Sequence, residues 1–291
     1  MESQPQRIPF HNQKVPDSQF DLVKIEHILS REMAHSPFQL HRLNFYGILV
    51  IIEGQGYHTI DFREYKYQTG TMLLLRKDQV HKFFRTGDTK GYLVAFTEDF
   101  VLDYFANSST LSSLQLFNET LNSPMIQLSE QTFADILHLV NYMDEEYLRI
   151  QDHFSPEIIL SLLHILLTKL YRHKSSQDNS VWEKKYLSEF IHFQQLVEVQ
   201  CFSTKKVKDY ADQLGFSAKK LNMVVQSVVE KSAKTFIDEI TVLHIKRLLI
   251  NSSLSIKEIA YEAGFEDPSN LFRYFKKYTE ATPEAFRQAY L

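Results

Sequence analysis

Apolar positions near the C-terminus repeat with helical spacing on both sides of a glycine, Gly264. Residues at i, i+3 and i+4 form one apolar stripe before this glycine and a second stripe after it. The stripe positions are Ile259, Ala260 and Ala263, then Leu271, Tyr274, Phe275 and Tyr278. Gly264 can adopt the positive φ of a turn, and Asp267 and Pro268 fit the N-cap and first position of the next helix. The pattern predicts a helix-turn-helix.

The outward face of the second predicted helix carries cations and short polar groups. Its residues are Ser269, Asn270, Arg273, Lys276 and Lys277. A helix with such a face can enter the major groove of double-stranded DNA, where side chains read base edges and contact phosphates. We therefore predict that these residues contact DNA.

The same pattern occurs 49 residues earlier (256 − 207), where Val207–Phe216 matches Ile256–Phe265 and Ser217 takes the N-cap place. The outward residues of this copy, also predicted to contact DNA, are Lys219, Lys220, Asn222, Met223 and Gln226. Met223 stands where the other copy has Arg273. We therefore expect this helix to depend on phosphate contacts, Asn222 and apolar contact, such as with a thymine methyl.

One continuous helix is predicted between the two copies, over residues 235–250. About 15 residues at 1.5 Å each give a rod of roughly 20–25 Å. Two helix-turn-helix units held by this rod could reach successive major grooves, which lie about 34 Å apart on one face of the duplex.

The N-terminal third of the chain has the pattern of short strands. β-branched, aromatic and alternating runs separated by turn residues occupy 45–53, 57–62, 65–70, 71–75, 81–84 and 92–96. Strands at such regular intervals are typical of an antiparallel sandwich or small barrel. Residues 1–20 are polar, contain three prolines and show no period, so we expect an extended arm.

Helical spacing replaces the strand pattern after the predicted barrel. Residues 133–147 carry one apolar stripe, and Ile158–Leu170 is apolar on more than one face, which predicts a helix buried on both sides. The expected fold is α+β and multidomain, with an antiparallel β-barrel, a helical segment and an all-α domain of two helix-turn-helix units joined by a long helix. The expected boundaries are an arm at 1–20, a sensing barrel at 21–125, a helical dimerisation segment at 126–174, a linker at 175–181 and a DNA-binding domain at 182–291.

Composition narrows the class of protein without naming a partner. The chain has 291 residues and one cysteine, Cys201, so it forms no intrachain disulfide, and a reducing compartment is expected. No apolar run approaches the roughly 20 residues of a membrane span, so we predict a cytoplasmic protein without a membrane partner. The net charge is −4, but 16 of the 32 Lys and Arg and only 14 of the 36 Asp and Glu fall in 182–291. The excess of two positive charges there has the sign that DNA binding requires.

The paired turns at Ala211–Phe216 and Ala260–Phe265, the run 267–278 and the closing Thr279–Arg287 resemble the AraC/XylS family of bacterial transcription regulators. The stretches 41–56 and 70–81 resemble, less closely, the two motifs of a cupin barrel. The resemblance implies a cupin-like sensing domain, a homodimer, RNA polymerase as a partner and a DNA-binding regulator, expected to be an activator. This chain departs from the family in the predicted connecting helix, where Thr241 and Ile245 stand at positions at which the family usually has arginine and alanine.

The barrel offers an expected site for a small-molecule effector. Its predicted pocket residues are His41, Arg42, Tyr46 and His81. His41 and His81 fill two ligand places of a metal-binding cupin, but Leu43 and Gly47 occupy the others, and a divalent ion needs three or four ligands. Glu53 or His58 could be recruited only if strand parity allowed it. We expect no bound metal, no cofactor and no catalytic residue.

Two alternatives remain open at the level of sequence. One is a cupin metalloenzyme that carries a DNA-binding domain, although no G-x-S-x-G nucleophile motif occurs and Cys201 has no arranged base. The other is a regulator whose barrel binds a protein partner in place of a small molecule. Metal analysis and ligand screening distinguish them.

Overall fold

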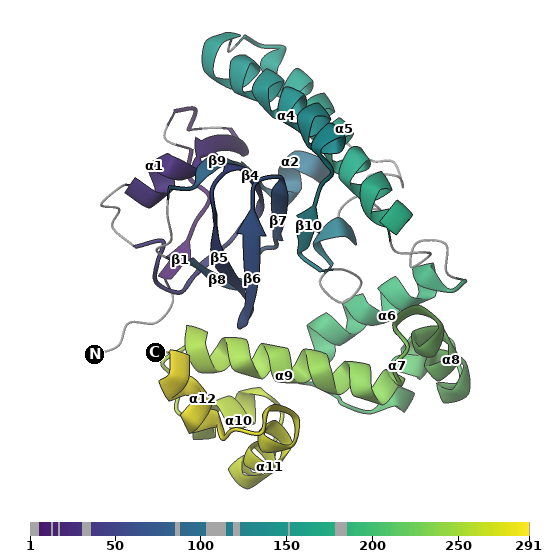
Figure 1. The fold of residues 1–291 in the computed structure, drawn as a ribbon. Helices are drawn as coiled ribbons and strands as arrows, with labels where there is room; N and C mark the ends of the chain where they lie inside the picture. The colour runs from purple at the N-terminus through teal and green to yellow at the C-terminus, as the bar shows by residue number, and fades with distance from the viewer. Residues whose placement is uncertain are drawn as a thin grey trace. The chain divides into compact units, whose positions relative to one another are not determined.

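The computed structural model describes residues 6–12, 14–16, 18–30, 36–84, 88–102, 115–118, 123–150, 152–177 and 185–290. The chain divides into two compact units, Pro5–Asp178 and Asn179–Leu291. The first contains β-sheets followed by helices, and the described part of the second is entirely helical (Figure 1). The predicted fold class is confirmed. Among the described residues, no helix is long and apolar enough to span a membrane.

The N-terminal unit contains two five-stranded sheets, in the orders β1-β3-β8-β5-β6 and β10-β7-β4-β9-β2. The strands are β1 Gln6–Ile8, β2 Phe20–Lys24, β3 His41–Leu43, β4 Tyr46–Glu53, β5 Gln55–Ile60, β6 Arg63–Gln68, β7 Thr71–Leu75, β8 Val80–Phe83, β9 Lys90–Phe96 and β10 Met125–Gln127. Leu43 and Ile60 of the first sheet share one buried cluster with Leu49 and Leu73 of the second. The two sheets therefore face each other across an apolar interior.

The second sheet is a central layer that is buried on both faces. Leu49 and Ile51 of β4 lie in the interior cluster, whereas Ile48 and Val50 belong to the cluster that includes helix residues such as Val140. Successive strand residues point to opposite faces, so a strand covered on both sides reads as a continuous apolar run. This is why the sequence of β4 shows no alternation.

Two helices cover the outer face of this sheet. Helix α4 (Glu130–Glu145) begins at the N-cap Ser129, ends in a π-helical turn (Glu146–Ile150) and is followed by α5 (Ser155–Gln177). Figure 1 shows α4 and α5 side by side. Tyr147, in the π-helical turn, accepts a hydrogen bond from Asn12 and donates one to Asp21, both at 2.7 Å. These bonds connect the N-terminal segment to the helical segment.

Three expectations for this unit need correction. The barrel is not wholly antiparallel, because β1 pairs in parallel with β3, and residues 6–8 of the expected arm are therefore part of a sheet. Helix α5 continues through Gln177, so 175–177 of the expected linker are helical, while 178–181 lie outside the described residues. Serine and glutamine do not end a helix as proline or glycine does. The pattern also missed α1 (Ile25–Ser30) and β10, which are too short to show a period.

The C-terminal unit places one helix-turn-helix at each end of a long helix (Figure 1). Its helices are α6 Leu187–Gln200, α7 Val207–Gln213, α8 Ala218–Val229, α9 Ala233–Asn251, α10 Ile256–Glu262, α11 Pro268–Thr279 and α12 Pro283–Tyr290. The connecting helix α9 has 19 residues, longer than expected from the apolar pattern. At 1.5 Å per residue its length is about 28 Å.

Candidate nucleic-acid interface and sensor site

The two helix-turn-helix units repeat the same local geometry. Gly215 and Gly264 end the first helix of each unit with φ angles of 67° and 74°. The side chain of Ser217 accepts a hydrogen bond from the backbone N–H of Lys220, and that of Asp267 accepts one from the backbone N–H of Ser269. These caps satisfy N–H groups that have no partner within the helix. The predicted turns and helix starts are thus confirmed.

The inward faces of α8 and α11 have the predicted register. Leu221, Val224, Val225 and Val228 are buried on α8, as are Leu271 and Phe275 on α11. Tyr274 and Tyr278 of α11 are partly buried. Each second helix therefore turns an apolar face inward and leaves the opposite face largely exposed.

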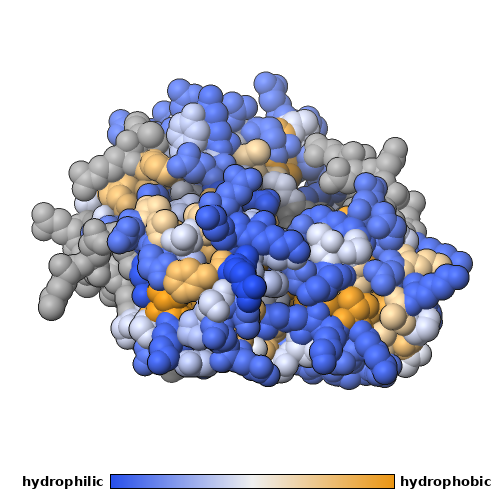
Figure 2. Space-filling view, turned by 90° about the horizontal axis from the view of Figure 1, so that it is seen from below, coloured by the Kyte–Doolittle hydropathy of each residue, from blue (hydrophilic) through white to orange (hydrophobic). Residues whose placement is uncertain are grey.

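The outward face of α11 brings its predicted DNA contacts together. Ser269, Asn270, Arg273, Lys276 and Lys277 are all exposed. The Arg273 guanidinium donates a 2.6 Å hydrogen bond from Nη2 to Oδ1 of Asn270, so these two side chains point the same way. Seen from the side on which α11 lies in Figure 1, the surface is predominantly hydrophilic, with separate small apolar spots (Figure 2).

The outward face of α8 is less charged. Lys219, Lys220 and Gln226 are exposed, as is Met223, whose side chain is 47% accessible. The Lys220 ammonium lies 3.8 Å from the centroid of the Phe216 ring. This cation–π contact directs the Lys220 side chain back toward the turn.

Asn222 has a different place from the one the sequence predicts. Its Oδ1 accepts a 3.0 Å hydrogen bond from the backbone N–H of Ala233, and its Nδ2 donates to the carbonyl of Ala218 at 3.0 Å. The amide therefore joins α8 to the start of α9, and both of its ends are engaged inside the unit. The sequence could not show this, because the repeat alone gives the outward position of Asn222 and not the path of the chain after α8.

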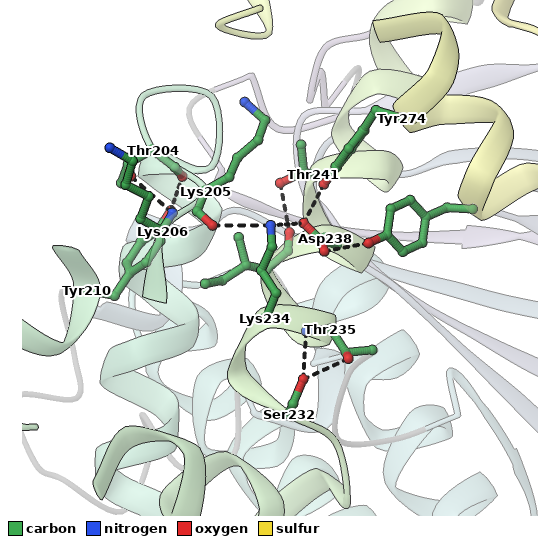
Figure 3. Close-up of polar contacts among 12 residues, drawn as sticks. Thr204, Lys205, Lys206, Tyr210, Ser232, Lys234, Thr235, Asp238, Thr241 and Tyr274 are labelled. Carbon is green, nitrogen blue, oxygen red and sulfur yellow. Dashed lines mark hydrogen bonds and ion pairs between the residues drawn. The ribbon is translucent and has the colours of Figure 1, made fainter. Parts of the chain in front are cut away.

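A buried carboxylate, which the sequence analysis did not single out, holds α11 on α9. Asp238 is 2% exposed. Its Oδ1 accepts hydrogen bonds from the Tyr274 hydroxyl at 2.7 Å and from Lys234 Nζ at 2.6 Å, and its Oδ2 accepts one from the Tyr278 hydroxyl at 2.5 Å (Figure 3). A buried carboxylate is tolerated only when its oxygens are paired in this way. We call these four residues the Asp238 network.

Both tyrosines of the network remain donors at neutral pH. Burial, together with the hydrogen bond to Asp238, raises the pKa of Tyr278 to about 12 and also raises the pKa of Tyr274. Their hydroxyl groups stay protonated, so the carboxylate of Asp238 keeps both hydrogen bonds. The network therefore does not depend on pH through its tyrosines.

Three histidines meet in the interior of the N-terminal unit. His41 pairs directly with His81 across β3 and β8, and Ile60 of β5 pairs with His81 from the other side. His58 lies two residues before Ile60 and so points to the same face. The ring centroids are 4.1 Å apart for His41 and His81 and 5.3 Å apart for His58 and His81. Strand parity thus places His58 beside His41 and His81, although it is not among the predicted pocket residues.

The histidines differ in how their ring nitrogens are satisfied. His41 Nδ1 lies 2.9 Å from the carbonyl oxygen of Gln39. Both ring nitrogens of His58 and of His81 are buried with no hydrogen-bond partner among the described residues. Unpaired buried polar groups are costly, and they call for an explanation such as a bound ligand. Within the described chain, however, no three His, Cys, Asp or Glu side chains form a group that could hold a metal ion.

Two of the four predicted pocket residues lie elsewhere. Arg42 follows His41 on β3 and so points to the opposite face of the sheet. Tyr46 stacks on Phe96 at 5.8 Å and packs edge-on against Phe117, in the cluster between the second sheet and the helices. The three histidines that lie together in the interior are thus His41, His58 and His81, because strand parity, and not nearness in sequence, decides which side chains share a face.

The stability of the N-terminal unit is expected to fall as the pH drops below about 6.5. Burial, and then the neighbouring His41, lowers the pKa of His58 to about 3 and also lowers the pKa of His81. The unfolded chain binds a proton at each imidazole below its usual pKa of about 6.5, while the folded chain does not, so acid favours unfolding. At pH 5.5 each of the two imidazoles should lower the free energy of unfolding by about 1.4 kcal/mol relative to its value at alkaline pH.

Hydrogen exchange of peptides from β5 and β8, measured in urea at pH 7.5 and 5.5, checks this expectation. The double variant His58→Leu, His81→Leu should lose most of the pH dependence, whereas His192→Gln, at an exposed position of α6, should keep it. A double variant that keeps the full pH dependence would assign the effect to other groups.

Comparisons with known proteins agree with this geometry. Residues 210–289 match the family described as helix-turn-helix domain, and residues 22–163 match the AraC-like ligand binding domain. The chain is 25% identical over 267 residues to YfiF, an uncharacterized HTH-type transcriptional regulator of Bacillus subtilis (strain 168), covering 88% of this chain and 81% of that protein. It is 21% identical over 254 residues to the HTH-type transcriptional activator RhaR of Enterobacter sp. (strain 638), covering 86% and 87%.

Solved structures are also similar. A structure of ToxT from Vibrio cholerae has 17% sequence identity and a TM-score of 0.45, covering 93% of this chain and 97% of that chain. The DNA-binding domain of AdpA, solved in complex with a target DNA, has 24% identity and a TM-score of 0.30, covering 34% of this chain and 91% of that chain.

Two capped helix-turn-helix units with exposed second helices define a DNA-binding transcription regulator. The family matches, one in the N-terminal and one in the C-terminal unit of the chain, agree with this class. The chain belongs to the AraC family of helix-turn-helix transcriptional regulators and carries an AraC-like ligand-binding domain on its N-terminal side. It is therefore a regulator and not an enzyme. Family membership argues against the alternative of a cupin metalloenzyme that carries a DNA-binding domain.

Proposed function

We propose that this regulator activates transcription by binding both of its helix-turn-helix units to one face of a DNA duplex, in response to a small molecule held in the N-terminal unit. The observation that carries the proposal is the pair of exposed second helices, α8 and α11, at the two ends of α9. With a length of about 28 Å, α9 suits successive major grooves about 34 Å apart. The name of the relative RhaR favours activation over repression.

The DNA contacts of the proposal are exposed residues of the two second helices, polar or charged except for Met223. They are Lys219, Lys220, Met223, Gln226, Ser269, Asn270, Arg273, Lys276 and Lys277. Asn222 leaves this set because its amide is engaged within the unit. As an activator, the protein would act in the cytoplasm and engage RNA polymerase beside its binding site.

The effector site of the proposal is the cluster of His41, His58 and His81. A neutral imidazole offers one hydrogen-bond donor and one acceptor, and His58 and His81 have both nitrogens unused among the described residues. Hydroxyl or carbonyl groups of a small organic molecule would satisfy them. All three rings are buried, which favours a small molecule over a protein partner, because a protein surface could not reach them.

Genome-wide footprinting of the tagged full-length protein tests the whole proposal. Discrete protected sites upstream of genes, each wide enough for two half-sites, are the expected result. The neighbouring genes would indicate the chemical class of the effector. Protection spread evenly over the genome would contradict sequence-specific regulation.

A homodimer is part of the proposal, formed through the outer face of the helical segment. Large apolar side chains are exposed there, namely Tyr142 of α4, Phe154 before α5, and Ile158 and Ile165 of α5. Ile158 and Ile165 are each 42% exposed and lie seven residues apart, on one side of α5. Exposed large apolar side chains that recur over one helical segment favour a protein–protein contact there.

The double variant Ile158→Glu, Ile165→Glu is expected to be monomeric. Each carboxylate would have to lose its hydration in the dimer contact without a partner, which weakens association by orders of magnitude. Sedimentation velocity of the wild type and the variant at about 10 μM measures the change. Val199→Glu is the matched control, because Val199 of α6 is apolar and 82% exposed but lies in the other unit. A dimeric double variant would contradict this interface.

A further inference from the structure

The Asp238 network extends beyond α9 and α11 to the loop between α6 and α7. Lys234 Nζ, which pairs with Asp238, also donates to the carbonyl of Lys205 at 3.2 Å (Figure 3). Lys205 Nζ in turn donates to the carbonyl of Ala263 at 2.8 Å. Ala263 ends α10, just before Gly264, so the path returns to the second helix-turn-helix. The polar contacts thus form a closed ring.

The loop of this ring is held by the first helix-turn-helix. The hydroxyl of Tyr210 in α7 donates to the carbonyl of Thr204 at 2.9 Å. Thr204 Oγ1 donates to the carboxylate of Asp209, also in α7, at 2.5 Å. Because α7 holds Thr204, which precedes Lys205, and the Asp238 network holds α11, these contacts connect the first helix-turn-helix to the second through α9.

The second helix-turn-helix is held in this way through the inward face of α11, whereas α8 is joined to the start of α9 through the amide of Asn222. In the repeat, Val224 and Val228 of α8 occupy the places of Tyr274 and Tyr278 of α11. Both valines are buried and pack on their neighbours through apolar contacts, which have little directional preference. Hydrogen bonds are directional and depend steeply on distance and angle. The orientation of α11 is therefore fixed more tightly than packing alone would fix it.

We propose that Asp238 is a positioning residue that fixes the distance and rotation between the two recognition helices, α8 and α11, and so sets the number of base pairs between the half-sites that the regulator accepts. The inference rests on the proposed binding of both units to one duplex. Asp238 itself is buried under α11 and touches no DNA. Its effect on DNA binding is exerted through the spacing of the two units.

A spacing series of operators tests this role. The wild-type full-length protein first selects its operator from random duplexes, and one base pair is then inserted or deleted between the half-sites. Each change shifts one half-site by about 3.4 Å and about 35°. The wild type should lose roughly 10- to 100-fold in affinity, because its two units can no longer bind together.

The variant Asp238→Asn should lose less than about fivefold in affinity when it is moved from its selected operator to the same altered operators. Asparagine keeps the shape of the side chain but replaces one accepting oxygen with a donating group. Glu239→Gln is the matched control, since Glu239 is the next residue of α9 and its carboxylate also pairs with a lysine, Lys231, but on the surface. The control should keep the spacing profile of the wild type. Gel shifts on all operators give the profiles.

A purely structural role for Asp238 predicts a different result. Affinity would then fall by the same factor on every spacing, and that result would overturn the proposal, as would an unchanged profile. If Asp238→Asn does not fold, Tyr278→Phe removes a single hydroxyl from the network and carries the same test. A wild type that tolerates every spacing would instead contradict two-headed binding itself, so the two failures can be told apart.

Discussion

Replacing Arg273 with alanine is expected to lower the affinity for operator DNA by about 5- to 150-fold, the range for one bidentate contact between arginine and a base. Arg273 is exposed on α11, and its guanidinium is oriented by the 2.6 Å hydrogen bond to Asn270. Gel shifts at several salt concentrations measure the loss. The steepness of the salt dependence should also fall, because one cation no longer displaces counterions from the duplex.

Met223→Ala is the matched comparison, because Met223 occupies the place of Arg273 in the other unit and is also exposed. It should lower the affinity by less than about threefold, since it removes one apolar contact and no charge. The two units thus contribute unequally, with α11 contributing more. Equal losses for the two variants would show that the charge difference between α8 and α11 does not decide their roles.

The helix-turn-helix units could be predicted from the sequence because short-range signals define them. The apolar stripes, the glycine turns and the caps at Ser217 and Asp267 all act within about ten residues. The repeat then aligned the outward faces of both units. The bond from Ala233 to Asn222 could not be predicted, because it depends on where the chain goes after α8.

The candidate effector site could be predicted only in part. Motif positions indicate His41 and His81, but the sheet register decides which neighbours share their face. Parity turns Arg42 away from these rings and brings His58 beside them, while Tyr46 of β4 packs against Phe96 and Phe117. A one-residue change of parity moves a side chain to the other face, so motif proximity is a weak guide.

The Asp238 network was beyond prediction for a related reason. Asp238 stands in the first half of α9, among residues that the apolar pattern assigns to a plain connecting helix. Its two tyrosine partners lie 36 and 40 residues further along the chain. Only the packing of α11 on α9 brings the three together. Tertiary contacts of this range leave no local signal in the sequence.

Replacing Gly264 with alanine is expected to destabilise the C-terminal unit by about 3–5 kcal/mol, among the larger effects of a single substitution. A Cβ at this position would lie 2.0 Å from the carbonyl oxygen of Phe202, so the loop between α6 and α7 would have to move. The positive φ of 74° adds roughly 1–2 kcal/mol of strain for any residue with a side chain. Calorimetry of the full chain, with hydrogen exchange of peptides from α10 and α11, measures the loss.

Gly215→Ala separates the two causes, because Gly215 has nearly the same φ, 67°, at the equivalent turn of the first unit. A Cβ there would meet no heavy atom of the described chain within 4 Å. The free energy of unfolding of this variant should therefore fall only by the backbone strain, roughly 1–2 kcal/mol. The difference in free energy of unfolding between the two variants measures the cost of moving the loop away from the second turn.

The same pair of variants should differ in DNA binding. Lys205 of that loop donates a hydrogen bond to the carbonyl of Ala263, so a shifted loop should disturb the second helix-turn-helix. Gly264→Ala should therefore lower the affinity for DNA far more than Gly215→Ala does. Equal losses would mean that the loop yields at little cost, and that the ring of contacts does not hold the two units in place.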